Sequence, residues 1–157
     1  MGAMLAVEQS GEGEPLVLIH GLATTRAIWM LVTPALSRRR RVVTLDVPGF
    51  GESEPAGPGF ELEAVADRIA RRLAARGVSG PFDLVGHSLG AGLALTLAAR
   101  RPHAVRKLVL AAPANAVARR RPARTGAMAT KRSPRWCTVA HDRARPRARA
   151  LMSPMKG

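Results

Sequence analysis

The segment GHSLG at residues 86–90 constrains the fold of this 157-residue chain more than any other stretch. The apolar run 82–85 before it predicts a strand, and residues 89–99 after it have helical character. The pattern G-x-S-x-G places glycines around the serine because a tight strand-to-helix turn leaves no room there for Cβ atoms. An ordinary glycine-rich turn with a serine N-cap is the alternative interpretation. The strand–turn–helix context favours the tight turn.

Further strands and helices alternate along the chain. Unbroken apolar runs such as 16–19 are typical of strands that are buried on both faces of a parallel sheet. Residues 61–76 predict an amphipathic helix, and residues 24–36 predict a helix that Pro34 kinks or ends. The pattern predicts an α/β fold with a mostly parallel sheet and helices on both faces. The predicted strands lie at residues 4–8 (an edge strand), 16–19, 42–45, 82–85 and 107–112.

The charge divides the chain into two parts. Residues 1–114 carry 13 basic and 10 acidic residues, whereas residues 115–157 carry 12 basic and 1 acidic. We therefore predict a folded domain over 1–114 and an Arg/Ala/Pro-rich basic tail without strands over 115–157. Three interpretations of the tail stay open: an out-of-frame product of a GC-rich gene, a nucleic-acid-binding arm, or a disordered regulatory or partner-binding tail. The abrupt loss of pattern favours the first, and a single aromatic residue, Trp136, disfavours nucleic acid.

Several classes of protein are disfavoured by composition. A single cysteine, Cys137, excludes an intrachain disulfide. The N-terminal residues lack the features of a secretory signal, and no stretch reaches the roughly 18 apolar residues of a membrane span. The four histidines lack metal-ligand spacing. We therefore expect a soluble cytoplasmic protein without a metal, an organic cofactor or a membrane partner.

Three segments together resemble the α/β-hydrolase family, in its serine hydrolase or esterase form. His20-Gly21 at a strand end resembles the family's oxyanion turn, and DVPGFGES at 46–53 resembles its D-x-P-G-x-G-x-S loop. GHSLG at 86–90 resembles its nucleophile elbow. The resemblance covers residues 4–114. It implies an α/β-hydrolase-like fold that is truncated after the family's sixth strand.

The resemblance also assigns roles to individual residues. Ser88 would attack an acyl carbonyl of an ester or related substrate. The backbone N–H groups of Leu22 and Leu89 would stabilise the resulting oxyanion. Asp46 and Ser53 would fix the loop between them. No cofactor or metal is implied.

The family's triad runs in the order serine, acid, histidine, and this chain departs from it. The resemblance places His20 in the oxyanion turn as a loop support, and the side chain of His87 away from the serine oxygen. Beyond residue 103, only His141 and Asp142 are present; they are adjacent and in the wrong order. The triad acid and histidine are therefore not identifiable, and we expect a weakly active or inactive hydrolase.

The alternatives are a catalytically dead hydrolase-like binding protein, or binding of nucleic acid or a partner through the basic tail. A chain that ends its sheet at residues 107–112 would leave an apolar strand edge exposed. We therefore also expect self-association through that edge.

Overall fold

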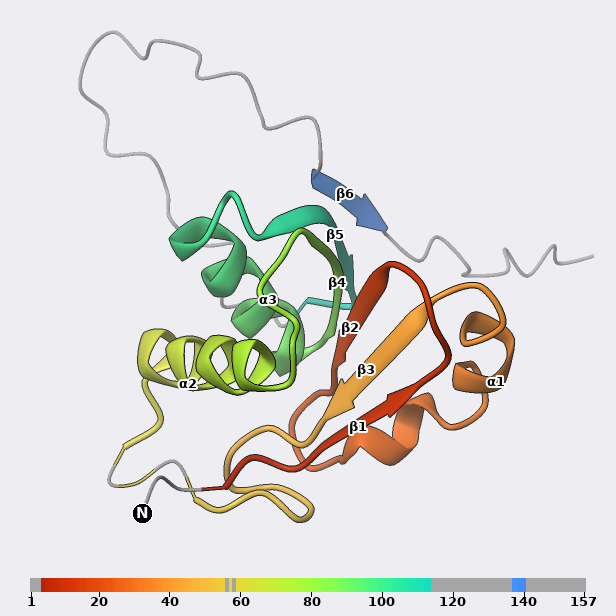
Figure 1. Ribbon diagram of the computed structural model, residues 1–157. Coiled ribbons are helices and arrows are strands. Elements are labelled where there is room, and N and C mark those ends of the chain that lie inside the picture. Colours follow the sequence, from red (N-terminus) through yellow and green to blue (C-terminus); the bar gives the residue numbers. More distant parts are fainter. Residues whose placement is uncertain (1–3, 56, 58, 114–136, 141–157) are drawn as a thin grey trace, which may run out of the picture.

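One six-stranded sheet organises the chain, and the computed structural model describes residues 4–55, 57, 59–113 and 137–140. The strand order is β1-β3-β2-β4-β5-β6 (Figure 1). β1 is antiparallel to β3, and the other neighbours are parallel. The predicted α/β class with a mostly parallel sheet is therefore confirmed. The strands are β1 (Val7–Ser10), β2 (Pro15–Ile19), β3 (Arg41–Leu45), β4 (Phe82–His87), β5 (Val105–Ala111) and β6 (Cys137–Ala140).

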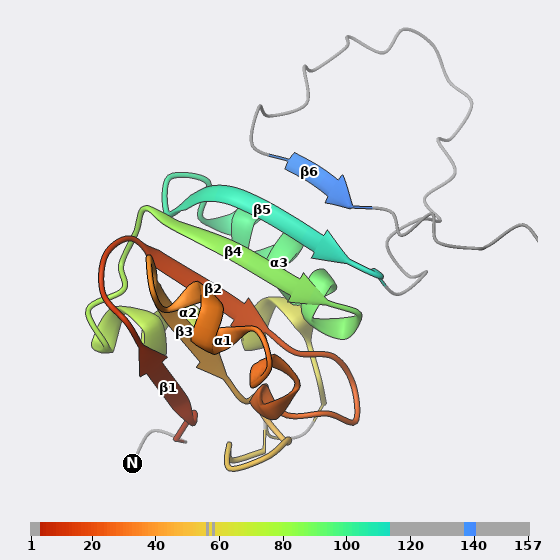
Figure 2. The ribbon, with the colours of Figure 1, turned by 90° about the vertical axis from the view of Figure 1, so that its right-hand side faces the viewer.

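Helices cover both faces of this sheet, as predicted. α2 (Leu62–Ala75) and α3 (Leu89–Arg100) lie on one face. The 3₁₀ turn η1 (Arg26–Trp29) and the short α1 (Thr33–Leu36) lie on the other, as Figures 1 and 2 show. Within the described ranges, none of the helices has the length and apolarity that crossing a membrane requires.

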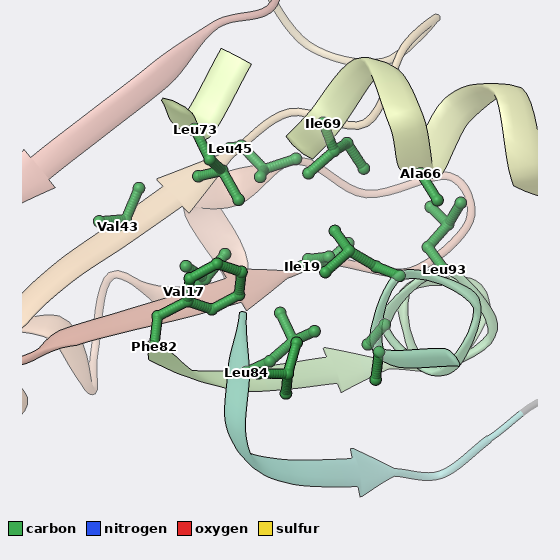
Figure 3. Packing of buried hydrophobic residues seen from close by; sticks show 14 of the residues in the cluster. Val17, Ile19, Val43, Leu45, Ala66, Ile69, Leu73, Phe82, Leu84 and Leu93 are labelled. Atoms are coloured by element: carbon green, nitrogen blue, oxygen red, sulfur yellow. The ribbon is translucent and has the colours of Figure 1, made fainter. Parts of the chain in front are cut away.

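The larger core lies between the sheet and α2 and α3. Val43 and Leu45 of β3 face Ile69 and Leu73 of α2 in this layer (Figure 3). Val42, which precedes Val43 on β3, joins a smaller cluster on the opposite face, together with Leu16, Leu18, Trp29 and Leu36. The central strands are thus buried on both faces, which is why their apolar runs are unbroken rather than alternating.

The helix predicted over residues 24–36 is wrong in extent. The segment forms one 3₁₀ turn and a separate four-residue helix, with Pro34 at the start of the second. Pro34 has no N–H that could donate to the preceding turn. Just before it, the Val32 N–H donates to the carbonyl of Trp29, which is three residues back. The apolar side chains therefore do not share one buried face, and Leu31 is 87% exposed.

The prediction of a strandless tail is wrong at residues 137–140. There β6 pairs in parallel with β5, so that Cys137–Ala140 lie beside Leu108–Ala111 (Figure 1). The β5 edge predicted to be exposed is therefore paired along Leu108–Ala111, and self-association of the chain stays a prediction. A four-residue run inside an Arg-rich segment has too little flanking pattern to be recognised as a strand. The rest of the predicted tail lies outside the described residues.

A cluster of charged side chains lies at the end of the sheet where the parallel strands begin. The buried carboxylate of Asp83 on β4 accepts from Arg40 Nη2 at 2.7 Å and from Arg106 Nε at 2.8 Å. Arg106 also pairs with Glu14, which precedes β2. Arg40, in the basic run 38–41, also donates to the carbonyls of Glu14 and Pro15, so it ties the start of β2 to β4.

The Asp83 cluster makes the stability of the fold depend on pH. Burial raises the pKa of the Asp83 carboxyl, but hydrogen bonds from Arg106 and Arg40 outweigh it and leave the pKa below its ordinary value. The pKa is then lower in the folded than in the unfolded chain, so the stabilisation is complete above about pH 4. It is lost as the pH falls through the folded-state pKa.

We expect Asp83→Asn to lower the free energy of unfolding at pH 7 and to flatten its decline toward pH 3. Urea titrations at both pH values measure this. Glu63→Gln, an exposed change on α2, is the matched control and should leave both quantities unchanged. If the free energy of unfolding of Asp83→Asn declined toward pH 3 as steeply as that of the parent, Asp83 would not be the source of the pH dependence.

Candidate active site

Ser88 stands at the junction of β4 and α3 in a strained backbone conformation. Its φ of 53° and ψ of −114° fall in a region that non-glycine residues rarely adopt. The Ser88 N–H donates to the carbonyl of Ala111, at the end of β5, over 3.0 Å. The strain therefore persists because the neighbouring strand holds the turn in place.

The two glycines of the motif are required by close backbone contacts. A Cβ atom at Gly86 would overlap the carbonyl of Gly90 and the Cα of Ala91. A Cβ atom at Gly90 would overlap the carbonyl oxygens of Ile19 and His20, at the end of β2. The first glycine lets the chain turn sharply, and the second lets α3 rest directly on β2.

The loop after β2 lies against this turn. A Cβ atom at Gly21 would be 3.0 Å from Ser88 Cβ and 3.0 Å from His87 Nδ1. The next residue, Leu22, has a side chain that is 65% exposed. Ala23 then takes a positive φ of 55°, which bends the loop back toward η1. The structure thus brings Gly21, the residue before Leu22, next to the predicted nucleophile.

His20 is fully buried and supports this loop through both ring nitrogens. Nε2 accepts from the Val47 N–H at 2.9 Å, so we assign the ring proton to Nδ1, which lies 2.7 Å from the Gly21 carbonyl. Burial lowers the pKa of His20, against the raising effects of the Gly21 carbonyl and Asp46. A neutral ring with both nitrogens engaged acts as a support for the loop, as the resemblance implies.

Asp46 anchors the other end of the loop. Its Oδ1 accepts from the Arg26 N–H at 2.7 Å, and its Oδ2 accepts from the Glu52 N–H at 3.1 Å. The Arg26 guanidinium pairs with the same carboxylate, and with Glu52 at 2.6 Å. Ser53 Oγ donates to the Asp46 carbonyl at 2.6 Å, which confirms the predicted structural role of both residues. Arg26 carries no motif or periodicity, so sequence reasoning missed it.

The other predicted site residues lie as follows. Leu89 is the first residue of α3, where helix geometry leaves its N–H without an intrahelical acceptor. His87 lies beside Gly21, and its Nδ1 is buried with no hydrogen-bond partner among the described residues. His103 follows the far end of α3, roughly 18 Å along the helix axis from Ser88. His141 and Asp142 lie outside the described residues.

No group of three or more potential metal ligands (His, Cys, Asp or Glu) comes together in the part of the chain that the structure describes.

Sequence comparison places this geometry in a known family. The α/β-hydrolase fold family model matches residues 14–138. The chain is 42% identical over 113 residues to a 2-hydroxymuconate semialdehyde hydrolase from Pseudomonas sp., covering 69% of this chain and 40% of that protein. It is 37% identical over 109 residues to a pimeloyl-[acyl-carrier protein] methyl ester esterase from Aeromonas hydrophila, covering 69% and 41%.

Solved structures agree with the sequence matches. A thermophilic esterase from Thermogutta terrifontis superimposes with a TM-score of 0.65 at 33% identity, covering 68% of this chain and 39% of that one. The chain thus spans about 40% of the length of the curated relatives that it matches. The family match extends to residue 138, beyond the segment on which the resemblance rested. The chain belongs to the α/β-hydrolase fold family.

Proposed function

We propose that this chain carries the nucleophile half of a serine hydrolase that acts on an ester or a related acyl substrate. The observation that carries the proposal is the strained Ser88 at the β4–α3 turn, with the Gly21 backbone against it. Strain of this kind is found where a side chain must be presented to a ligand. The names of the relatives, which include hydrolases and methyl ester esterases, support the same reaction class.

In this proposal Ser88 Oγ attacks the acyl carbon, and the carbonyl electrons move onto its oxygen. The N–H groups of Leu22 and Leu89 then stabilise that oxyanion, each contributing about 3 kcal/mol in the transition state. Solvent water accepts the serine proton, because both His20 nitrogens are already engaged. The bond between the acyl carbon and the alcohol oxygen of the ester then breaks, and the alcohol leaves. Without a general base a serine hydroxyl is a weak nucleophile, so we expect acylation to be slow.

The test is acyl transfer from p-nitrophenyl acetate to the full chain, with the site of acetylation mapped by mass spectrometry. We expect acetyl on Ser88, and p-nitrophenol release at least about tenfold faster than in Ser88→Ala. Added imidazole should accelerate release by the parent chain more than by Ser88→Ala, because it supplies the missing proton acceptor. Ser79→Ala, an exposed serine, is the matched control and should behave like the parent.

Equal rates for the parent and Ser88→Ala, with no acetyl on Ser88, would contradict the proposal. If the rates are equal and the parent chain still binds a short-chain ester analogue, the chain is the catalytically dead, hydrolase-like binding protein. Circular dichroism of both variants separates this result from a failure to fold.

A further inference from the structure

The loop after β2 contains one peptide unit that carries both a fixed carbonyl and a proposed oxyanion donor. The carbonyl of Gly21 and the N–H of Leu22 belong to this unit. Because a peptide unit is planar and this one is trans, its C=O and its N–H point in opposite directions. The groups that hold the Gly21 carbonyl therefore also set the direction of the Leu22 N–H.

Two side chains hold the Gly21 carbonyl. Its oxygen lies 2.7 Å from His20 Nδ1 and accepts from Thr24 Oγ1 at 2.9 Å. His20 Nε2 accepts from the Val47 N–H, so Nδ1 carries the ring proton and cannot accept one from Thr24, whose Oγ1 lies 3.3 Å away. The Thr24 proton is thus left to the Gly21 oxygen, and both lone pairs of that carbonyl are engaged.

Gly21 by itself would not fix the plane of this peptide unit. A Cβ atom there would lie 3.0 Å from Ser88 Cβ and 3.0 Å from His87 Nδ1, so the close approach of loop and turn favours a glycine. Glycine, however, restricts its own backbone dihedral angles less than any other residue does. The plane after Gly21 is therefore fixed from outside, and its rotation would break the hydrogen bonds from His20 and Thr24 together.

The Leu22 N–H itself is left for a ligand. In the ranges that the structure describes, neither a backbone nor a side-chain acceptor takes a hydrogen bond from it. If the plane turned over, the Gly21 oxygen would point where the Leu22 N–H points now. Its partial negative charge would then repel an oxyanion that the N–H would otherwise stabilise.

We infer that Thr24 is a positioning residue for acyl transfer at Ser88. Its hydroxyl, together with the His20 ring, holds the peptide plane in which the Leu22 N–H faces the oxyanion. This inference rests on the proposed function, because the oxyanion forms only in that reaction. Loss of the hydroxyl should lower the rate of acylation and leave substrate binding unchanged, since the bound ester carries no oxyanion.

The first measurement is acylation of the full chain by p-nitrophenyl acetate over a range of ester concentrations. We expect Thr24→Val to lower the maximal acylation rate about fivefold, the effect of one neutral hydrogen bond, with the concentration for half-maximal rate unchanged. Thr24→Ser keeps the hydroxyl and should behave like the parent. The matched control is Thr25→Val, because the Thr25 hydroxyl accepts from the Ala27 N–H at 3.3 Å and should not affect the rate.

A second measurement reports on the peptide plane without any chemistry at Ser88. A hydrogen bond to a carbonyl deshields its carbon and the amide nitrogen of the same peptide unit. In the full chain labelled with ¹³C and ¹⁵N, Thr24→Val should therefore move the Gly21 carbonyl carbon and the Leu22 amide nitrogen upfield. Thr24→Ser and Thr25→Val should leave both shifts close to those of the parent. The same pattern should appear in the Ser88→Ala background.

The outcomes separate this inference from the proposed function. Absence of acetyl from Ser88 in the parent would overturn the proposed function, and with it any role of Thr24 in acylation. An acetylated parent whose rate Thr24→Val does not lower would overturn the inference alone. Equal losses in Thr24→Val and Thr24→Ser would also overturn it, because the hydroxyl would not be the group responsible. Circular dichroism verifies the fold of each variant, and Thr24→Ala replaces Thr24→Val should the valine variant unfold.

Discussion

Gly90→Ala should destabilise the chain by about 3 kcal/mol, enough to lower its thermal midpoint by roughly 10 °C. The added Cβ atom would overlap two backbone oxygens, those of Ile19 and His20. Backbone atoms at the end of a central strand cannot rotate away as a flexible side chain can. The overlap is relieved only if α3 moves off β2, which loosens the core and displaces the Ser88 turn together. Thermal unfolding followed by circular dichroism measures the effect.

The matched control lies two residues further along the same helix. At Gly92 a Cβ atom would be 4.0 Å from Leu62 Cδ1, which is an ordinary contact. Because alanine favours the helix over glycine, Gly92→Ala should stabilise the chain by up to about 1 kcal/mol. Similar midpoints for the two variants would show that α3 does not rest on β2 as closely as described.

Asp46→Ala should cost about 3 kcal/mol, because it removes a buried carboxylate that several groups share. The change leaves the N–H groups of Arg26 and Glu52 without their acceptor and removes one partner of the Arg26 guanidinium. The end of the Leu22 loop at Arg26 and the loop 46–53 both depend on these contacts. Urea unfolding at pH 7 measures the loss, and Asp46→Asn, which keeps the shape and one acceptor, should fall between the parent and Asp46→Ala.

Asp67→Ala provides the comparison for an exposed ion pair. Asp67 on α2 pairs with Arg100 at 2.6 Å, but the two side chains are 26% and 45% exposed. Pairs of this kind add little to stability, so the variant should unfold close to the parent. Equal losses in Asp46→Ala and Asp67→Ala would mean that burial and the shared backbone donors at Asp46 contribute nothing.

The central elements of the fold were predictable because their patterns are dense and local. The unbroken apolar run at 16–19 and the largely apolar run at 42–45 became β2 and β3, and the helix predicted over 61–76 is observed as Leu62–Ala75. Predictions failed where tertiary contacts decide the structure. The segment 24–36 has helical periodicity, but it forms a 3₁₀ turn whose first residue is held by Asp46 and a separate short helix that begins next to Pro34. β6 is specified by its pairing with β5 rather than by its own four residues.

The part of the candidate site that lies in sequence motifs was predictable. GHSLG and His20-Gly21 located the strained serine and the loop against it, since each motif encodes a backbone requirement that the structure displays. The supporting groups were not predictable. Arg26 and Arg40 are two of many arginines in the chain, and only the fold shows which of them meet a buried carboxylate.

The hydrogen bond from the Ser88 amide to the Ala111 carbonyl links the strained turn to the end of β5. If β5 separates from β4, that amide loses its acceptor and the turn is free to relax to an ordinary conformation. The exchange rate of the Ser88 amide with deuterated solvent would then report the opening of that side of the sheet. One backbone proton can thus reveal whether Ser88 is held in its strained conformation, independently of any substrate.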